Sequence, residues 1–112
     1  MSTAGGHPSD EDRERAALPV LERVIEASRS HDLDALAECY DEDVVWLAAD
    51  GISRGRAGAI ARHRAILATA DGWTLPQQNG ARAALRWSGA DGAMGAIVVE
   101  VRRGRIIFAA TA

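Results

Sequence analysis

The chain has 112 residues, of which 47% are hydrophobic and 26% charged, and its formal net charge is −3. This length predicts one domain, and the composition is ordinary for a soluble globular protein. The acidic balance argues against a general nucleic-acid-binding role. All 13 basic residues are arginine, which is typical of a GC-rich, bacterial genome.

Three further features predict the cellular location. Cys39 is the single cysteine, so the chain can form no intramolecular disulfide, and a reducing environment fits. No apolar run reaches the ~18 residues of a membrane span. The first residues contain no apolar segment of the kind found in secretory signals. We therefore expect a cytoplasmic protein without a membrane or nucleic-acid partner.

The chain opens with a segment, residues 1–9, that we expect to be a flexible tail, because it is small and glycine-rich. A helix is predicted over about 10–30, with Ser9 as its cap and acidic residues in its first turn. Pro19 either kinks this helix or marks the first turn of its ordered part. One face of the helix is largely apolar and carries Ala17, Val20, Leu21, Val24, Ile25 and Ser28.

Residues 31–55 are predicted to contain the end of the first helix, a short second helix, a turn, a strand and a glycine loop. Asp32 is a good cap for a short helix near 33–40, and residues 41–43 are predicted to form a solvated acidic turn. The apolar face of this helix carries Leu33, Leu36, Cys39 and Tyr40. A strand is expected near 44–49, because Val44-Val45-Trp46-Leu47 is β-branched, aromatic and apolar. The Asp50-Gly51 pair is a turn signal.

The second half of the chain changes from helical spacing to alternation. A third helix is predicted over about 56–70, and strands over about 81–89, 93–103 and 105–111. Pro76 restricts any strand near 73–75 to a sheet edge. Helices followed by a β-meander predict an α+β domain, with helices on one face of a curved, mostly antiparallel sheet.

Several motifs in this order resemble the SnoaL-like and ketosteroid-isomerase-like branch of the nuclear transport factor 2-like superfamily. They are His31-Asp32-Leu33-Asp34-Ala35-Leu36, Tyr40, the acidic residues 41–43, Val44-Val45-Trp46 and Gly55-Arg56. His31 stands where the family usually has glycine. The resemblance covers roughly residues 18–111, so residues 10–112 are expected to form a single SnoaL-like domain. It implies a cone-like fold in which three N-terminal helices and the sheet often enclose a ligand pocket.

Two residues are candidates for proton transfer. His63 lies on the apolar side of the third predicted helix, and its ordinary pKa lies near neutrality. The alternative is a core histidine bonded within the fold. Asp50 follows the strand and can face a cavity mouth, but Asp-Gly is also a plain turn signal. Arg54 and Arg56 either hold an anionic ligand, pair with Asp50 or lie on the solvated surface.

A second set of residues is predicted to line an apolar pocket, with core packing as the alternative for each. The set consists of Val24, Tyr40, Trp46, Leu47, Trp73, Trp87 and Met94. The three histidines are too widely spaced for a recognisable metal motif, and no phosphate-binding glycine loop is present. We expect neither a metal nor a cofactor.

The resemblance also implies that the residues used in ketosteroid isomerisation are missing from this chain. Ketosteroid isomerisation uses an aspartate base and two hydrogen-bond donors, a tyrosine and a protonated aspartate. In this chain the corresponding positions fall at Val24, Leu47 and near Val98. None of these side chains can donate or accept a proton, so the usual ketosteroid isomerase mechanism is not expected.

The resulting functional prediction is a pocket protein that binds, isomerises or cyclises an apolar, ring-containing metabolite of the polyketide or steroid kind. The alternative is a non-catalytic homodimeric binding or assembly module. A homodimer through the sheet is expected in either case, because the last three strands carry apolar residues on both faces.

Overall fold

The computed structural model describes residues 9–74 and 77–111. The helices are α1 (Asp10–Ser30), α2 (Leu33–Cys39) and α3 (Gly55–Leu67). The strands are β1 (Tyr40–Ala48), β2 (Gly51–Arg54), β3 (Ala70–Trp73), β4 (Gln77–Asn79), β5 (Arg82–Gly89), β6 (Met94–Arg102) and β7 (Arg105–Ala110). Apart from Ser9, which accepts a hydrogen bond from the Asp12 amide and caps α1, the predicted tail lies outside the described residues.

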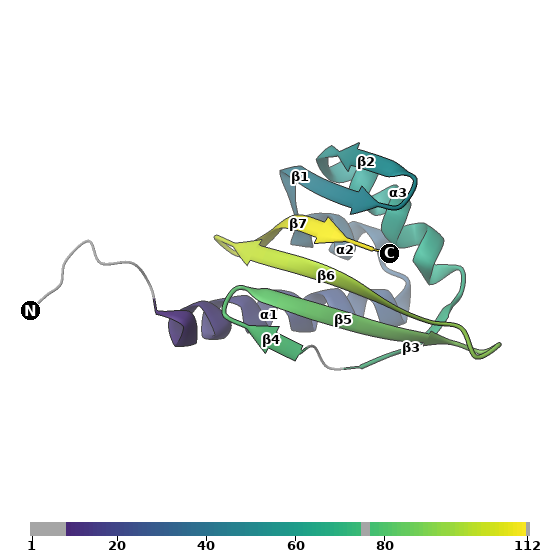
Figure 1. The fold of residues 1–112 in the computed structure, drawn as a ribbon, viewed down its shortest axis with the longest axis horizontal. Helices are drawn as coiled ribbons and strands as arrows, with labels where there is room; N and C mark the ends of the chain where they lie inside the picture. The colour runs from purple at the N-terminus through teal and green to yellow at the C-terminus, as the bar shows by residue number, and fades with distance from the viewer. Residues whose placement is uncertain (1–8, 75–76, 112) are drawn as a thin grey trace, which may run out of the picture.

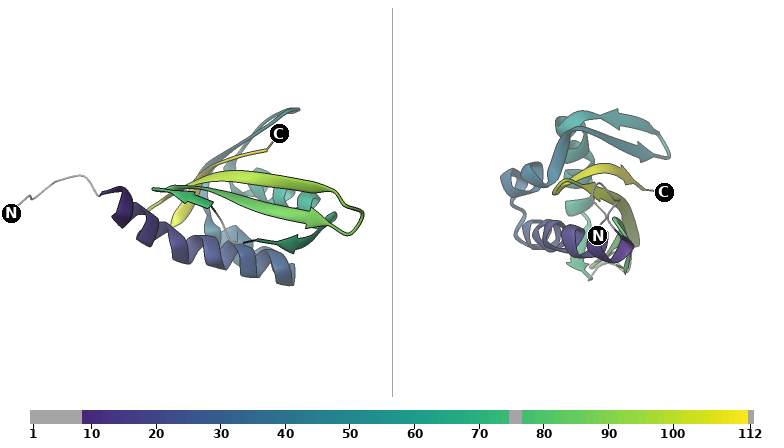
Figure 2. Two further views of the ribbon diagram at one scale, coloured as in Figure 1. Left: turned by 60° about the horizontal axis from the view of Figure 1, so that its bottom comes forward. Right: turned by 90° about the vertical axis from the view of Figure 1, so that its left-hand side faces the viewer.

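The strands form one sheet in the order β2-β1-β7-β6-β5-β3, and β4 also pairs with β5. All pairings are antiparallel except that of β1 with β7. The sheet curves, and the three helices lie on its concave side (Figures 1 and 2). This arrangement confirms the predicted α+β fold class.

The core fills the space between helices and sheet. Its largest fully buried side chains include Leu21 and Val24 from α1, Leu36 from α2, and Leu85 and Ile97 from the central strands. The apolar face predicted for α1 is therefore the face that packs inward, and α1 continues through Pro19. No helix in the described part of the chain combines the length and apolar character needed to cross a membrane.

Strand β1 begins earlier than the sequence indicates. Residues 41–43, predicted to be a solvated turn, belong to β1, and the register with β7 shifts between Tyr40 and Val45. Within this irregular segment the Asp43 amide donates to the Asp41 carboxylate at 3.0 Å. A bulge lets three polar residues pass through a strand without entering the core, which a reading of hydrophobic periodicity does not detect. The glycine loop after residue 50 similarly contains the short strand β2.

Candidate functional site

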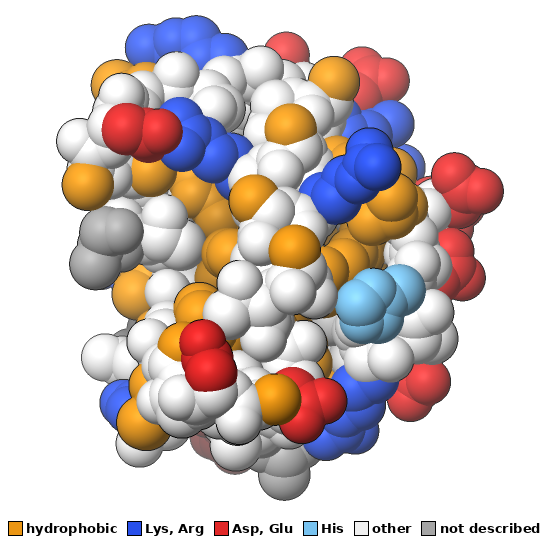
Figure 3. Space-filling view, turned by 90° about the vertical axis from the view of Figure 1, so that its right-hand side faces the viewer, with side chains coloured by type: hydrophobic (Ala, Val, Ile, Leu, Met, Phe, Trp, Pro, Cys, Tyr) orange, Lys and Arg blue, Asp and Glu red, His pale blue; other side chains and the backbone are white. Residues whose placement is uncertain are grey.

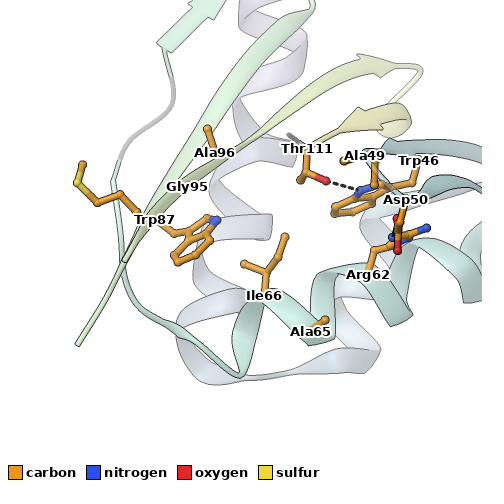
Figure 4. A pocket seen from close by; sticks show the side chains of 12 residues that line it. Trp46, Ala49, Asp50, Arg62, Ala65, Ile66, Trp87, Gly95, Ala96 and Thr111 are labelled. Carbon is orange, nitrogen blue, oxygen red and sulfur yellow. Dashed lines mark hydrogen bonds and ion pairs between the residues drawn. The ribbon is translucent and has the colours of Figure 1, made fainter. Parts of the chain in front are cut away.

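A cavity of about 460 Å³ opens at the end of the molecule where β1, α3 and the β5–β6 hairpin meet. Its lining consists of Trp46, Ala48, Ala49, Asp50, Arg62, Ala65, Ile66, Trp87, Met94, Gly95, Ala96 and Thr111. Figure 4 shows Trp87, Ile66, Arg62, Asp50, Trp46 and Thr111 around the open space. On the surface at this end of the molecule, hydrophobic side chains lie in the recess and charged side chains surround it (Figure 3).

Two tryptophans form opposite walls of this cavity. Trp46 comes from the inner face of β1, and Trp87 comes from β5, where it pairs across the sheet with Gly95 of β6. A Cβ atom at position 95 would lie only 2.5 Å from Cζ2 of Trp87 and 2.7 Å from its Nε1. Glycine is therefore required at position 95 for the indole to lie across the neighbouring strand beside the cavity.

The cavity rim carries an ion pair. Asp50, in the turn after β1, accepts a hydrogen bond from Nη1 of Arg62 at 2.5 Å, and Nε of Arg62 donates to Ser53 Oγ at 2.9 Å. This hydrogen bond and the positive charge of Arg62 lower the pKa of Asp50. The partner is thus an α3 residue and not Arg54 or Arg56; Arg56 donates to the Tyr40 carbonyl at 2.9 Å.

Thr111 brings a hydroxyl to the same cavity. Its Oγ1 accepts a hydrogen bond from Nε1 of Trp46 at 3.2 Å, and its backbone amide donates to the Leu47 carbonyl at 2.9 Å. The end of the chain is thereby attached to β1, and the Trp46 ring is held in its position in the wall (Figure 4).

His63 is fully buried behind this wall and does not line the cavity. The Tyr40 hydroxyl lies 2.7 Å from its Nδ1, and Ser28 Oγ lies 2.9 Å from its Nε2. The imidazole also stacks on Trp73, with ring centroids 5.6 Å apart. The cluster joins α1, β1, α3 and β3, so it ties the helices to the sheet.

The direction of each hydrogen bond in this cluster follows from its neighbours. Ser28 Oγ donates to the Val24 carbonyl at 2.7 Å, so its single proton is used and it accepts from Nε2–H of His63. A neutral imidazole protonated on Nε2 has an acceptor at Nδ1, which accepts a hydrogen bond from the Tyr40 hydroxyl. Every polar atom of the cluster is then satisfied.

The electrostatics agree with a neutral histidine. Burial lowers the pKa of His63 to about 4 and raises the pKa of Tyr40. No carboxylate bonds to the imidazole among the described residues. The expected acidic partner of a catalytic histidine is replaced by two hydroxyl groups, one from the tyrosine and one from the serine. Neither was assigned to His63 from the sequence, because they lie 23 and 35 positions away.

The residues predicted to bind ligand fall into three groups. Trp46 and Trp87 border the cavity, and Trp46 is itself fully buried, whereas Met94 lies at its edge and is 82% exposed. Tyr40, Trp73 and Val24 belong to the buried core. Leu47 is 45% exposed on the opposite side of β1 from Trp46. The lining residues Arg62, Ile66 and Thr111 were not singled out for the pocket, since only the tertiary arrangement of α3 and the chain end brings them there.

The positions implied for the isomerase machinery do not surround the cavity. Leu47 and Val98 are each 45% exposed, and Val24 is buried on α1. On β1 the side chains that line the cavity are Trp46 and Ala48. Within the described residues, no group of three or more His, Cys, Asp or Glu side chains is placed to hold a metal ion.

A curved, mostly antiparallel sheet covered by three helices, with a cavity at one end, is the architecture of the nuclear transport factor 2-like superfamily. Within it, the chain belongs to the SnoaL-like domain family, whose model matches residues 21–109. This membership confirms the family resemblance of the sequence motifs. A comparison with curated protein sequences gives no match.

Solved structures share the fold at low sequence identity. An NTF-2 like protein of unknown function from Burkholderia xenovorans LB400 has a TM-score of 0.72 and 20% identity, covering 89% of this chain and 84% of that one. A candidate polyketide cyclase from Sinorhizobium meliloti has a TM-score of 0.68 and 19% identity, covering 84% and 94%. A candidate ketosteroid isomerase from Kribbella flavida DSM 17836 has a TM-score of 0.70 and 16% identity, covering 87% and 76%. These likenesses establish the fold, which hosts several functions.

Proposed function

We propose that this protein binds an apolar, ring-containing small molecule of the polyketide or steroid kind in the cavity at the end of the sheet. The observation that carries this proposal is the open space between two indoles, that of the half-buried Trp87 and that of Trp46, which is fully buried at the back of the cavity. Flat aromatic walls with alanine and isoleucine side chains between them suit a flat apolar ligand. The volume, about 460 Å³, is within the range of small-molecule sites.

The position and protonation state of His63 argue against proton transfer by this histidine. His63 is sealed behind the wall with both nitrogens bonded, and its lowered pKa keeps it neutral. A general base must reach its substrate directly or through one water. Of the two candidates, Asp50 alone lines the cavity. If the bound molecule is isomerised or cyclised, Asp50 is the proton carrier, and Asp50→Asn abolishes turnover while ligand binding persists.

The proposal is tested by filling the cavity. Ala48 lines it, whereas the adjacent Leu47 is exposed on the other face of the same strand. Ala48→Phe places a ring in the cavity, and Leu47→Phe is the matched control with a ring outside. Wild type and both variants are incubated with a library of hydrophobic metabolites, and retained compounds are identified by mass spectrometry. Retention of ring compounds by wild type and Leu47→Phe but not by Ala48→Phe supports the proposal. No retention, or equal retention by Ala48→Phe, refutes it.

A second proposal concerns assembly: the outer face of the sheet pairs two copies of the chain. Leu47, Ile52 and Val98 are exposed by 45%, 55% and 45%. Leu47 pairs with Ile52 and with Ala110, and Ala110 pairs with Val98, so these residues form a continuous apolar strip across β2, β1, β7 and β6. Such a strip on the side away from the helices is suited to burial against an identical surface.

A further inference from the structure

We propose that Thr111 and Trp87 are hydrogen-bond donors to the ligand, so that the cavity selects ring compounds carrying an acceptor oxygen, such as a carbonyl, carboxylate or phenolate oxygen. This inference rests on the proposed ligand pocket and adds the chemical class of its occupant.

The Thr111 hydroxyl has a proton that it can donate in a hydrogen bond. Its Oγ1 already accepts from Nε1 of Trp46 at 3.2 Å. A hydroxyl that accepts one hydrogen bond keeps its own proton as a donor. No acceptor for this proton is found among the described residues, and the hydroxyl lies in the cavity lining.

The indole N–H of Trp87 is the second donor. Trp87 is half-buried against Gly95, and its Nε1 lies on the side of the ring facing the cavity (Figure 4). Nothing in the described part of the chain accepts from this nitrogen, and no buried side-chain nitrogen or oxygen there lacks a partner. The Trp87 N–H is therefore open to solvent, and hence to a ligand. An indole has no acceptor nitrogen, so it can serve only as a donor.

The remaining polar groups of the lining are already paired. Arg62 bonds Asp50 and Ser53, and Trp46 bonds Thr111. Asp50 brings acceptor oxygens, but its carboxylate sits on the rim with 75% of the side chain exposed, and it is engaged by Arg62. The groups left for a ligand inside the cavity are thus two donors. A ligand acceptor can take a hydrogen bond from either donor, whereas a ligand donor is limited to the second lone pair of Thr111 Oγ1 and to the exposed Asp50 carboxylate on the rim.

The test compares two bicyclic probes of nearly equal shape: 1-indanone carries a carbonyl oxygen, and indane carries only hydrogens at that position. The hydrophobic effect alone favours indane, since burying a carbonyl without a partner costs free energy. A hydrogen bond from Thr111 or Trp87 to the carbonyl oxygen should reverse this order of affinity. We expect 1-indanone to bind about tenfold more tightly than indane, because a net hydrogen bond is worth roughly two- to tenfold in affinity.

Variants assign the effect to the two donors. Thr111→Val should weaken 1-indanone binding about three- to tenfold and change indane binding less than twofold. Trp87→Phe also removes part of the cavity wall, so it should weaken the binding of both probes, and that of 1-indanone more than that of indane. Thr111→Ser, which keeps the hydroxyl, should retain the preference for 1-indanone over indane. The indole 15N–1H signal of Trp87, identified by its loss in Trp87→Phe, should move downfield with 1-indanone and not with indane.

The outcomes separate this inference from the proposed pocket. If neither 1-indanone nor indane binds, the pocket proposal fails and this inference falls with it. If both bind with equal affinity, or if Thr111→Val and Trp87→Phe weaken both equally, the pocket stands and the donor pair is refuted. A preference for 1-indanone that disappears in the two variants supports the donor pair.

Discussion

The Tyr40 hydroxyl donates a hydrogen bond of 2.7 Å to Nδ1 of the fully buried His63. This contact joins the start of β1 to the middle of α3 and fixes the tautomer of the imidazole. It makes the histidine a part of the core instead of a base in the cavity, and it determines how the protein should respond to mutation and to pH.

Tyr40→Phe should lower the free energy of unfolding by about 1–3 kcal/mol, because it leaves the buried Nδ1 without a donor. Chemical denaturation measures this loss. In a His63→Leu background the same substitution should cost much less, since the acceptor is gone. An equal cost in both backgrounds would show that the hydrogen bond contributes nothing and that only packing is lost.

Acid should destabilise the fold through His63. Its pKa is about 4 in the folded protein against an ordinary 6.5, so between these values the unfolded chain binds a proton that the folded chain does not. Stability contributed by the neutral ring is complete above about pH 6.5 and is lost as the pH falls toward 4. The loss amounts to about 3 kcal/mol at 1.36 kcal/mol per pKa unit.

Denaturation midpoints between pH 7 and pH 4 check this expectation. The decline should be shallower in His63→Leu, which has no titrating ring in the core. His31→Asn is the matched control, because His31 is exposed at the end of α1 and asparagine tolerates its positive φ of 55°. A His63→Leu profile parallel to that of the wild type would contradict the burial account.

Gly95→Ala should destabilise the protein by about 1–3 kcal/mol through overpacking, since the new Cβ would lie 2.5 Å from the Trp87 ring. Adding Trp87→Leu should remove most of this cost, because the smaller side chain leaves room for the methyl group. Thermal unfolding of the two single variants and the double variant checks the coupling. Additive losses would mean that the indole is not what excludes a side chain at position 95.

The outer apolar strip should support a dimer at micromolar concentration. Val98→Glu should shift sedimentation to the monomer, because it places charge in the centre of the strip. Leu18→Glu is the control, since Leu18 is similarly exposed, at 39%, but lies on α1. A wild-type monomer, or a dimer insensitive to Val98→Glu, would count against pairing through the sheet.

The order of helices and the central strands could be predicted from the sequence because both depend on local periodicity. The face carrying Leu21 and Val24 is buried as its spacing indicates, and alternation identified β5, β6 and β7. The acidic segment of β1 was missed, since its bulge is stabilised by pairing with β7, a strand about 60 residues away that local patterns do not reveal.

The candidate site was less predictable. Aromatic and thioether side chains are common in pockets, which is why the sequence points to Trp46, Trp87 and Met94; the two tryptophans border the cavity and Met94 lies exposed at its edge. Thr111 and Arg62 carry no such signal, because their importance lies in the neighbours that folding gives them. The same holds for His63: only the three-dimensional positions of Tyr40 and Ser28 distinguish a sealed core histidine from a catalytic one.

The central claim is that the space between Trp46 and Trp87 holds an apolar ring compound, and intermolecular nuclear Overhauser effects with 1-indanone test it most directly. The account predicts contacts from the bound rings to the methyl groups of Ala48 and Ile66, which line the cavity. Contacts only to Leu47 and Val98 on the outer face of the sheet, or no contacts at saturating 1-indanone, would contradict it.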